Sequence, residues 1–500
     1  MLLWAPAICI VSLAVLGLFA RLYFGQYFKG RLDPNSRCHR DDEVNDAPKM
    51  ICKPSALAKY LLKTCLTVSA GPQTRWIWRK FPHLQTVWNG IWPTGSAMQF
   101  TRDYLQLSDE GLVALDWAVT AKGGRRRASS NSPAPIVLVI PNSFGKITRN
   151  IIQKIAGRES GESQCPQIET MKRCIYRRTI RGRKSFAACR EDGSMRRRDG
   201  DLALQLCASA LECGHRPVIF NRRCQNGCLL TTLKLQQFGD PSDLREAVRY
   251  IRYKHPNARL FTVSESTGAG LLLSYLGECG SSSYVTCAAC ISPIFRCQEW
   301  FETGPPWLYH WLLLLYQKTW LSRYTTVLGE IVDMDKLFAT QTLKEFEEVL
   351  FCQTKKSSLC WDTYWEKNDP LRDVDEVAVP VLCICSEDDP CRGEPDTTVP
   401  FELFETNPHF FLLLTKHGGH CGFLKSRSSV WSHEVLLEYF KSVSEFFATE
   451  ERTKSFSKRK YAVAVNSMPY KCGRGNSFKG NSFCSHNIHE IFSWQRSYTR

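Results

Sequence analysis

Short, mostly apolar runs alternate with helical patterns along the middle of the chain. The runs occupy residues 136–140, 217–220 and 260–263, and the helical patterns occupy residues 201–214 and 241–254. A strand that is apolar on both faces is typical of a parallel sheet with helices packed on either side. The alternation therefore predicts an α/β fold with a mostly parallel central sheet and helices on both faces.

Further elements extend this pattern in both directions. A β-hairpin is predicted around the turn Asp109-Glu110-Gly111, because strand-like residues flank it. More strands are expected at residues 285–292, 379–385 and 409–415, and a final helix at residues 431–447. A hydrophobic content of 43% supplies enough apolar side chains for a large core and excludes a wholly disordered chain.

Composition divides the chain into four parts. They are an apolar N-terminal segment (1–32), a linker with a helical segment (33–89), an α/β domain (90–450) and a basic tail expected to be mostly flexible (451–500). Inside the domain, Gly157 to Gly200 is rich in Arg, Ser and Gly without an apolar period, which predicts a disordered basic insertion. Residues 294–371 are helical and rich in tryptophan, which predicts a helical cap. Its tryptophans either form the core of the cap or line a site for acyl chains.

The N-terminal segment bears on where the protein is located. Leu2 to Ala20 is uncharged and mostly apolar, and Arg21, Lys29 and Arg31 follow it. Nineteen residues come close to the length that spans a bilayer, and positive residues after the span favour a cytosolic domain. We expect a membrane anchor at the endoplasmic reticulum or plasma membrane. The alternative is a cleaved signal peptide and a secreted protein.

The formal net charge of +16 is unevenly distributed. Most of it falls in residues 151–200 and 451–500, so the rest of the chain is nearly neutral and no nucleic-acid partner is expected. The 23 cysteines lack disulfide or metal-ligand spacing. Cys287 and Cys290 lie in an apolar run and are expected in a buried strand. We expect neither a metal nor a cofactor.

Ser266 is the candidate nucleophile. The sequence Val263-Ser264-Glu265-Ser266-Thr267-Gly268 follows a predicted strand directly and precedes a helix. A strand-to-helix turn of this kind presents a nucleophilic serine at the edge of a parallel sheet. The alternative is a serine in an ordinary turn between a strand and a helix.

Two further residues complete a candidate triad. Asp389 follows the strand at 379–385, and His420 follows the strand at 409–415 after Gly418-Gly419. The order Ser, Asp, His, with each residue just past a strand, suits a nucleophile, an orienting acid and a general base. Asp388 and His417 are the nearby alternatives.

The oxyanion of such a reaction needs N–H donors. The expected donors are the backbone N–H of Thr267, which follows the nucleophile, and that of Ser143, in the loop after the strand at 136–140. After the strand at 217–220, Asn221-Arg222-Arg223 is interpreted as an ion-pair site, with a substrate clamp as the alternative.

Several of these motifs together resemble the family 4 α/β-hydrolases. They are Phe81-Pro82-His83-Leu84-Gln85-Thr86, Asp116-Trp117, Phe220-Asn221-Arg222-Arg223, Asp388-Asp389-Pro390 and Gly418-Gly419-His420 with Gly422-Phe423. Segments 239–244, 274–280, 361–365 and 494–500 look like one member in particular. The resemblance covers nearly the whole chain except about Gly157 to Gly200.

The resemblance implies an α/β-hydrolase fold and a serine hydrolase of lipid or carboxylic esters, such as acylglycerols or phospholipids, at a membrane. For the one member, it implies a regulator that restrains lipolysis by binding a cyclic-nucleotide phosphodiesterase, and this is the alternative function. Three residues depart from the family pattern: Ser264 at the first elbow glycine, Asn142 before the oxyanion donor, and Cys224 where glycine is usual. A side chain at Asn142 could block or reorient the oxyanion N–H.

Overall fold

The computed structural model describes most of the 500-residue chain. The described residues are 47–71, 81–91, 98–119, 134–142, 188–190, 195–197, 202–228, 230–425 and 429–466. The apolar segment predicted at residues 1–32 lies outside these ranges. None of the helices in the described part of the chain is long and apolar enough to cross a membrane.

The described strands form one sheet that is parallel in its centre. The strands are β1 (Lys49–Ile51), β2 (Met98–Gln106), β3 (Leu112–Val119), β4 (Ile136–Ile140), β5 (Ala188–Arg190), β6 (Met195–Arg197), β7 (Arg216–Asn221), β8 (Leu260–Glu265), β9 (Cys287–Ile291), β10 (Val381–Ser386) and β11 (Phe410–Thr415). Their order is β1-β11-β10-β9-β8-β4-β7-β3-β2-β5, and β6 also pairs with β2. The strands from β11 to β7 are mutually parallel, and β1, β3, β2, β5 and β6 pair antiparallel.

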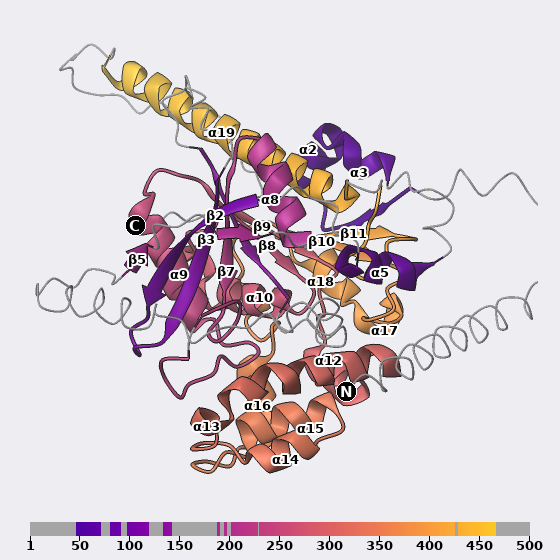
Figure 1. The fold of residues 1–500 in the computed structure, drawn as a ribbon. Coiled ribbons are helices and arrows are strands. Elements are labelled where there is room, and N and C mark those ends of the chain that lie inside the picture. The colour runs from indigo at the N-terminus through magenta and orange to yellow at the C-terminus, as the bar shows by residue number, and fades with distance from the viewer. Residues whose placement is uncertain are drawn as a thin grey trace, which may run out of the picture. The chain divides into compact units, whose positions relative to one another are not determined.

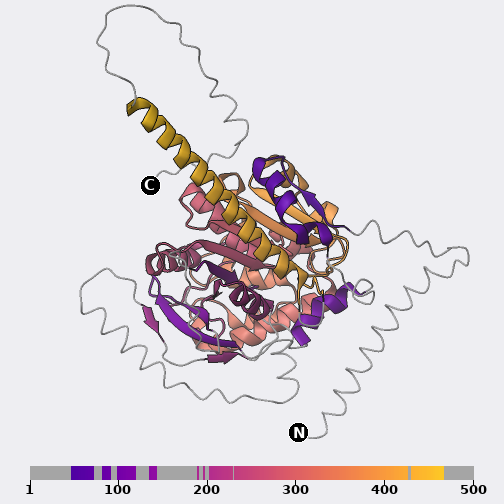
Figure 2. The same ribbon diagram turned by 90° about the horizontal axis from the view of Figure 1, so that it is seen from above.

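Helices cover both faces of the sheet (Figure 1). Those around the sheet are α2 (Ala56–Thr64), α3 (Leu66–Ala70), α5 (Pro82–Ile91), α8 (Leu202–Glu212), α9 (Ser242–Lys254), α10 (Gly268–Cys279), α17 (Pro395–Thr398), α18 (Phe401–Thr406) and α19 (Trp431–Asn466). One core joins α2, α8 and α19 to the sheet, and a second joins α9, α10 and α18 to its other face. Figure 2 shows α19 lying across the first face, where Phe440 stacks on Phe261 of β8 with ring centroids 4.8 Å apart. The predicted α/β class is confirmed.

The cap consists of helices between β9 and β10. They are α11 (Cys297–Thr303), α12 (Trp307–Leu321), α13 (Thr325–Leu328), α14 (Met334–Ala339), α15 (Leu343–Glu347), a π-helical turn (Glu348–Cys352) and α16 (Trp361–Asn368). The cap has its own hydrophobic core, in which Trp300, Trp361 and Trp365 are buried. Trp307 and Trp311 of α12 are instead exposed, at 71% and 53%. The cap tryptophans therefore divide between core packing and solvent.

The structure differs from the predicted elements in two places. The final helix begins at Trp431 as expected but continues to Asn466 instead of ending near residue 447. Within the predicted insertion, β5 and β6 pair with β2 at the edge of the sheet, and the remainder of that interval lies outside the described residues. The predicted hairpin is confirmed, since β2 and β3 pair antiparallel around the turn. Cys287 and Cys290 are buried in β9, also as expected.

Candidate active site

Ser266 lies in a tight turn between β8 and α10. Its backbone has the positive φ of 50° that few residues other than glycine adopt, and its N–H donates to the carbonyl oxygen of Ile291 at 2.9 Å. A Cβ atom on Gly268 would lie 2.6 Å from the carbonyl oxygen of Pro141, so this second elbow position must be glycine. Ser264 is fully buried, and the turn forms with this serine in place of the usual first glycine.

The structure brings Asp389 and His420 to Ser266. The distance between His420 Nε2 and Ser266 Oγ is 2.7 Å. On the other side of the imidazole ring, His420 Nδ1 lies 2.9 Å from Oδ2 and 3.0 Å from Oδ1 of Asp389. Ser266 and Asp389 are buried, at 4% and 3% exposure. The three side chains therefore form a continuous hydrogen-bonded chain at the carboxyl ends of β8, β10 and β11.

Electrostatic contacts keep Asp389 in its charged form. Burial would raise the pKa of this carboxyl group, but the electrostatic interaction and hydrogen bond with His420, together with the charge of Arg392, hold the pKa below its usual value. The backbone N–H groups of Cys391 and Arg392 also donate to Asp389 Oδ1, at 2.9 and 3.0 Å. An ionised carboxylate can orient an imidazole and stabilise its protonated form.

Thr86 fixes the loop that carries His420, a role that the sequence did not reveal. The N–H of His420 donates to Thr86 Oγ1 at 2.9 Å. A Cβ atom on Gly419 would lie 2.6 Å from the carbonyl oxygen of Pro82, and Gly419 has a φ of +57°. The motif Phe81 to Thr86 therefore packs α5 against the histidine loop. Its recognition as a family motif was the only signal that could have pointed to this role.

Asp388 and His417 were the alternatives to Asp389 and His420. In the structure they lie beside the hydrogen-bonded chain of Ser266, His420 and Asp389 and are not part of it. Asp388 Oδ1 accepts the N–H groups of Gly418 and Gly419, each at 2.9 Å. His417 Nδ1 lies 3.4 Å from the other carboxylate oxygen of Asp388. These contacts hold the backbone just before His420, whereas the ring of His420 contacts Asp389.

The oxyanion region is described in part. Thr267 Oγ1 donates to Asn142 Oδ1 at 2.6 Å, which joins the end of β4 to the residue after the nucleophile. Thr267 stands directly before α10, where the positive end of the helix dipole favours negative charge. Ser143 lies outside the described residues. The side chain of Asn142 is thus tied to the elbow by this hydrogen bond.

Two residues of Asn221-Arg222-Arg223, at the end of β7, form buried networks. Asn221 Nδ2 donates to Asp116 Oδ2 at 2.9 Å. Arg223 donates to both carboxylate oxygens of Asp243, at 2.6 and 2.7 Å, and to Asp109. For Asn221 and Arg223, the structure agrees with a structural ion-pair site.

Cys391 brings a thiol close to the triad. One ligand atom each of Asp389, Cys391 and His420 lie within 4.8 Å of one another, which is the grouping among the described residues that could hold a metal ion. Burial raises the pKa of the Cys391 thiol well above its ordinary value. In this grouping, both carboxylate oxygens of Asp389 already lie within hydrogen-bond distance of His420 Nδ1.

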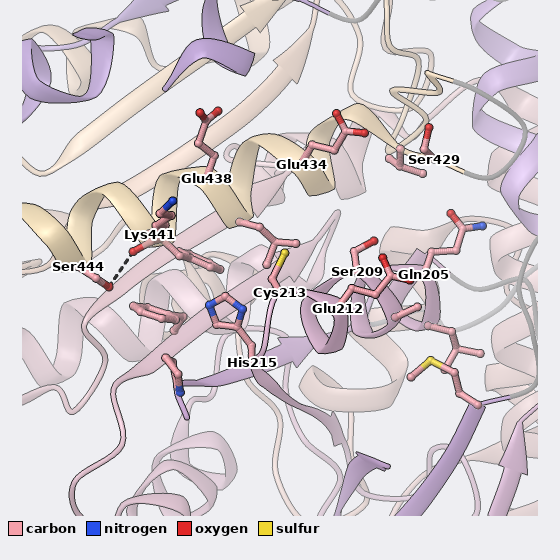
Figure 3. A pocket seen from close by; sticks show the side chains of 18 of the residues that line it. Gln205, Ser209, Glu212, Cys213, His215, Ser429, Glu434, Glu438, Lys441 and Ser444 are labelled. Atoms are coloured by element: carbon pink, nitrogen blue, oxygen red, sulfur yellow. Dashed lines mark hydrogen bonds between the residues drawn. The ribbon is translucent and has the colours of Figure 1, made fainter. Parts of the chain in front are cut away.

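A cavity of about 930 Å³ lies between α8 and α19 (Figure 3). Its polar lining includes Gln205, Ser209, Glu212, Glu434, Glu438 and Lys441. The lining contains no member of the candidate triad. Glu438 is also engaged elsewhere, since it accepts the N–H groups of Leu66 and Thr67, each at 3.1 Å. The cavity is therefore separate from the chemistry around Ser266.

Glu347 is a buried carboxyl group in the cap with a shifted pKa. Burial raises its pKa from 4.5 to about 7, against a hydrogen bond from Tyr364 and the charge of Arg222, which both lower it. Between about pH 4.5 and 7 the native state thus binds more protons than the unfolded state. The contribution of this group to the free energy of unfolding must therefore fall as the pH rises through that window.

We predict that Glu347→Gln removes this pH dependence. Urea unfolding measures the free energy of unfolding at pH 5 and at pH 8. From pH 5 to pH 8, this free energy should fall by about 2 to 3 kcal/mol more in the wild type than in the variant. Glu348→Gln, which changes the neighbouring carboxylate, is the matched control and should behave like the wild type. Equal pH dependence in the wild type and Glu347→Gln would show that Glu347 titrates normally.

Comparison with known proteins identifies relatives along most of the chain. No protein-family model matches it. Protein ABHD15 of Homo sapiens is 48% identical over 457 residues, which cover 90% of this chain and 85% of that protein. Phospholipase ABHD3 of Mus musculus is 29% identical and covers 82% of this chain and 87% of that protein.

More distant similarities are shorter or weaker. Monoacylglycerol lipase ABHD2 of Danio rerio is 24% identical over 43% of this chain and 56% of that protein. Among solved structures, an esterase from Pyrococcus furiosus is 14% identical, with a TM-score of 0.34, and covers 68% of this chain and 90% of its own. A likeness at that level supports no inference about function. The identity to ABHD15 over nearly the full length is decisive, and the chain belongs to the α/β-hydrolase family that includes ABHD15, ABHD3 and ABHD2.

Proposed function

We propose that this protein is a serine hydrolase of lipid or other carboxylic esters. The observation that carries the proposal is the hydrogen-bonded chain from Ser266 Oγ to His420 Nε2 and from His420 Nδ1 to Asp389. The printed names of the relatives, which include phospholipase and monoacylglycerol lipase, support lipid esters as the substrate class.

Each member of the triad has a defined task in the proposed reaction. Ser266 Oγ attacks the ester carbonyl carbon while its proton passes to His420 Nε2, and Asp389 stabilises the resulting imidazolium. The N–H groups of Thr267 and Ser143 are proposed to stabilise the oxyanion. When the tetrahedral intermediate collapses, His420 returns the proton to the leaving alcohol. Water then attacks the acyl-enzyme, again with His420 as base, and releases the carboxylic acid and free Ser266.

Covalent labelling with a fluorophosphonate probe tests this proposal. The purified full-length wild type should label, because the probe phosphonylates a serine activated by a base, and Ser266→Ala should not label at all. Ser432→Ala is the matched control, since Ser432 is likewise a buried serine but lies on α19. Labelling that survives Ser266→Ala, or a folded wild type that does not label, would contradict the proposal.

A regulatory role without catalysis remains the second prediction. In this role, the protein would bind a cyclic-nucleotide phosphodiesterase and thereby restrain lipolysis. The cap, the basic tail or the final segment Ile488 to Arg500 would hold such a partner, and the final segment lies outside the described residues. Absence of labelling in a folded wild type, with co-precipitation of the phosphodiesterase that is lost on removing residues 485–500, would favour this role.

We also propose that residues 1–32 anchor the protein in a membrane with the domain in the cytosol. The support is the uncharged run from Leu2 to Ala20 followed by basic residues. Alkaline extraction of membranes tests the anchor, since an anchored chain stays in the pellet and a cleaved, released chain does not.

A further inference from the structure

Arg222 is the one residue of Asn221-Arg222-Arg223 that takes no part in the surrounding hydrogen-bond networks. It is only 6% exposed, and its guanidinium forms no hydrogen bond or ion pair with any of the described residues. Nη2 in particular is fully buried without a partner. Its neighbours Asn221 and Arg223 are both bonded to carboxylates. Arg222 is therefore not part of the ion-pair site that was predicted for this segment.

The nearest carboxyl groups do not neutralise this charge by contact. Asp243 interacts with Arg222 at a distance, but both of its oxygens accept hydrogen bonds from Arg223. Glu347 accepts the hydroxyl of Tyr364 at 2.6 Å, and its raised pKa leaves it partly protonated at neutral pH. Burial lowers the pKa of Arg222 to about 10, so the guanidinium remains charged. A buried cation without an anion is unfavourable, and an anionic ligand would relieve it.

The register of the sheet places Arg222 level with the nucleophile. Val139 of β4 is aligned with Ile219 of β7 on one side and with Val263 of β8 on the other. Arg222 and Ser266 each stand three residues beyond this level, in the same direction along parallel strands. Adjacent strands lie about 4.8 Å apart, so two strand spacings, roughly 10 Å, separate the two backbone positions.

The cap contacts the segment that follows Arg222. Trp320 of α12 donates its indole N–H to the carbonyl oxygen of Cys224 at 2.9 Å, two residues after Arg222. Glu347 of α15 lies within electrostatic reach of Arg222. The guanidinium is thus enclosed between the cap and the carboxyl edge of the sheet, where ligands of open α/β sheets bind.

We propose that Arg222 binds the phosphate group of a glycerophospholipid substrate while Ser266 attacks one of its ester carbonyls. This inference rests on the proposed function and narrows its substrate class. A guanidinium offers paired N–H donors that match two phosphate oxygens. In a glycerophospholipid, the phosphate and an ester are carried on neighbouring glycerol carbons, so one molecule can reach both residues. A neutral acylglycerol has no anionic group that could pair with the guanidinium of Arg222.

A comparison of charged and neutral esters tests the proposal with the full-length protein. Arg222→Met should lower kcat/KM for dihexanoyl phosphatidylcholine roughly tenfold to a hundredfold, because a hydrogen-bonded charge is lost. Hydrolysis of p-nitrophenyl hexanoate, which has the same acyl chain and no phosphate, should be nearly unchanged. Arg222→Lys should restore part of the loss. Arg245→Met, which removes a surface arginine paired with Glu278, is the matched control and should leave both rates unchanged.

Two results would overturn the assignment of Arg222. An equal loss on both esters would mean that Arg222 only supports the structure of the site. No loss on the phospholipid would mean that the guanidinium does not meet the headgroup.

A binding measurement separates this inference from the proposed chemistry. In a Ser266→Ala background, dihexanoyl phosphatidic acid should raise the unfolding temperature more than dihexanoylglycerol does, and Arg222→Met should abolish the difference. If no serine labels and no ester is hydrolysed, the proposed function fails, while this shift still tests the anion site. An Arg222-dependent shift with inorganic phosphate and none with the phosphatidic acid would assign the site to free phosphate and overturn the headgroup proposal.

Discussion

Asp389→Asn should lower kcat/KM for an ester substrate by about four orders of magnitude, the effect expected when the acid of such a triad becomes an amide. The carboxylate accepts the Nδ1 proton of His420. An amide Nδ2 in that place is a donor, so His420 would carry its proton on Nε2 instead. The nitrogen that faces Ser266 would then be unable to take up the hydroxyl proton. Steady-state hydrolysis of p-nitrophenyl butyrate measures the loss.

The neighbouring aspartate supplies the matched comparison. Asp388→Asn removes the charge of the side chain that accepts the N–H groups of Gly418 and Gly419, but the amide oxygen can still accept them. We expect a loss of about tenfold or less for this variant, through the position of the loop alone. A larger loss for Asp388→Asn than for Asp389→Asn would reverse the assignment of the two aspartates. Circular dichroism and thermal unfolding establish that both variants fold.

Asp116→Ala should destabilise the fold by about 3 to 5 kcal/mol, the usual effect of leaving a buried charge without its partner. Asp116 of β3 accepts two hydrogen bonds from Arg102 of β2, at 2.6 and 2.8 Å, and one from Asn221 of β7. Arg102 is only 2% exposed. Burial would lower its pKa, but the hydrogen bonds and charge of Asp116 raise it above its usual value. Urea-induced unfolding followed by tryptophan fluorescence gives the change in free energy.

A surface ion pair provides the control for this stability change. Glu434 and Lys425 form a pair with exposures of 37% and 42%. Glu434→Ala should therefore cost at most about 1 kcal/mol, because water screens both charges. A shift for Asp116→Ala no greater than that of Glu434→Ala would show that the buried pair does not hold β2, β3 and β7 together.

The sequence predicted the central sheet and the order of the triad for the same physical reason. Strands such as β4 and β8 are buried on both faces. The sequence of β4 is wholly apolar and that of β8 begins with mostly apolar residues, so both are easy to recognise. Polar residues directly after such strands must lie at the carboxyl edge of the sheet. That is why Ser266, Asp389 and His420 could be proposed together although 154 positions separate Ser266 from His420.

Contacts between distant segments could not be predicted in this way. Thr86 supports His420, and Asn142 contacts Thr267, but neither pairing leaves a periodic pattern in the chain. Asp116 was recognisable only as part of a family motif, and its partner Arg102 carries no signal of its own. The length of α19 was underestimated because its distal part, after the buried Phe447, lacks the apolar period that marks a packed helix.

The pairing of β5 and β6 with β2 has a consequence for the behaviour of the protein in solution. β2 is the longest strand described, and β3 occupies only one of its sides. Without β5 and β6, the other side would expose unpaired backbone N–H and C=O groups that could pair with a strand of another molecule. β5 and β6 form backbone pairs with β2 on this side. Proteolysis that removes residues 188–197 should therefore expose this side of β2 to pairing with strands of other molecules and cause precipitation.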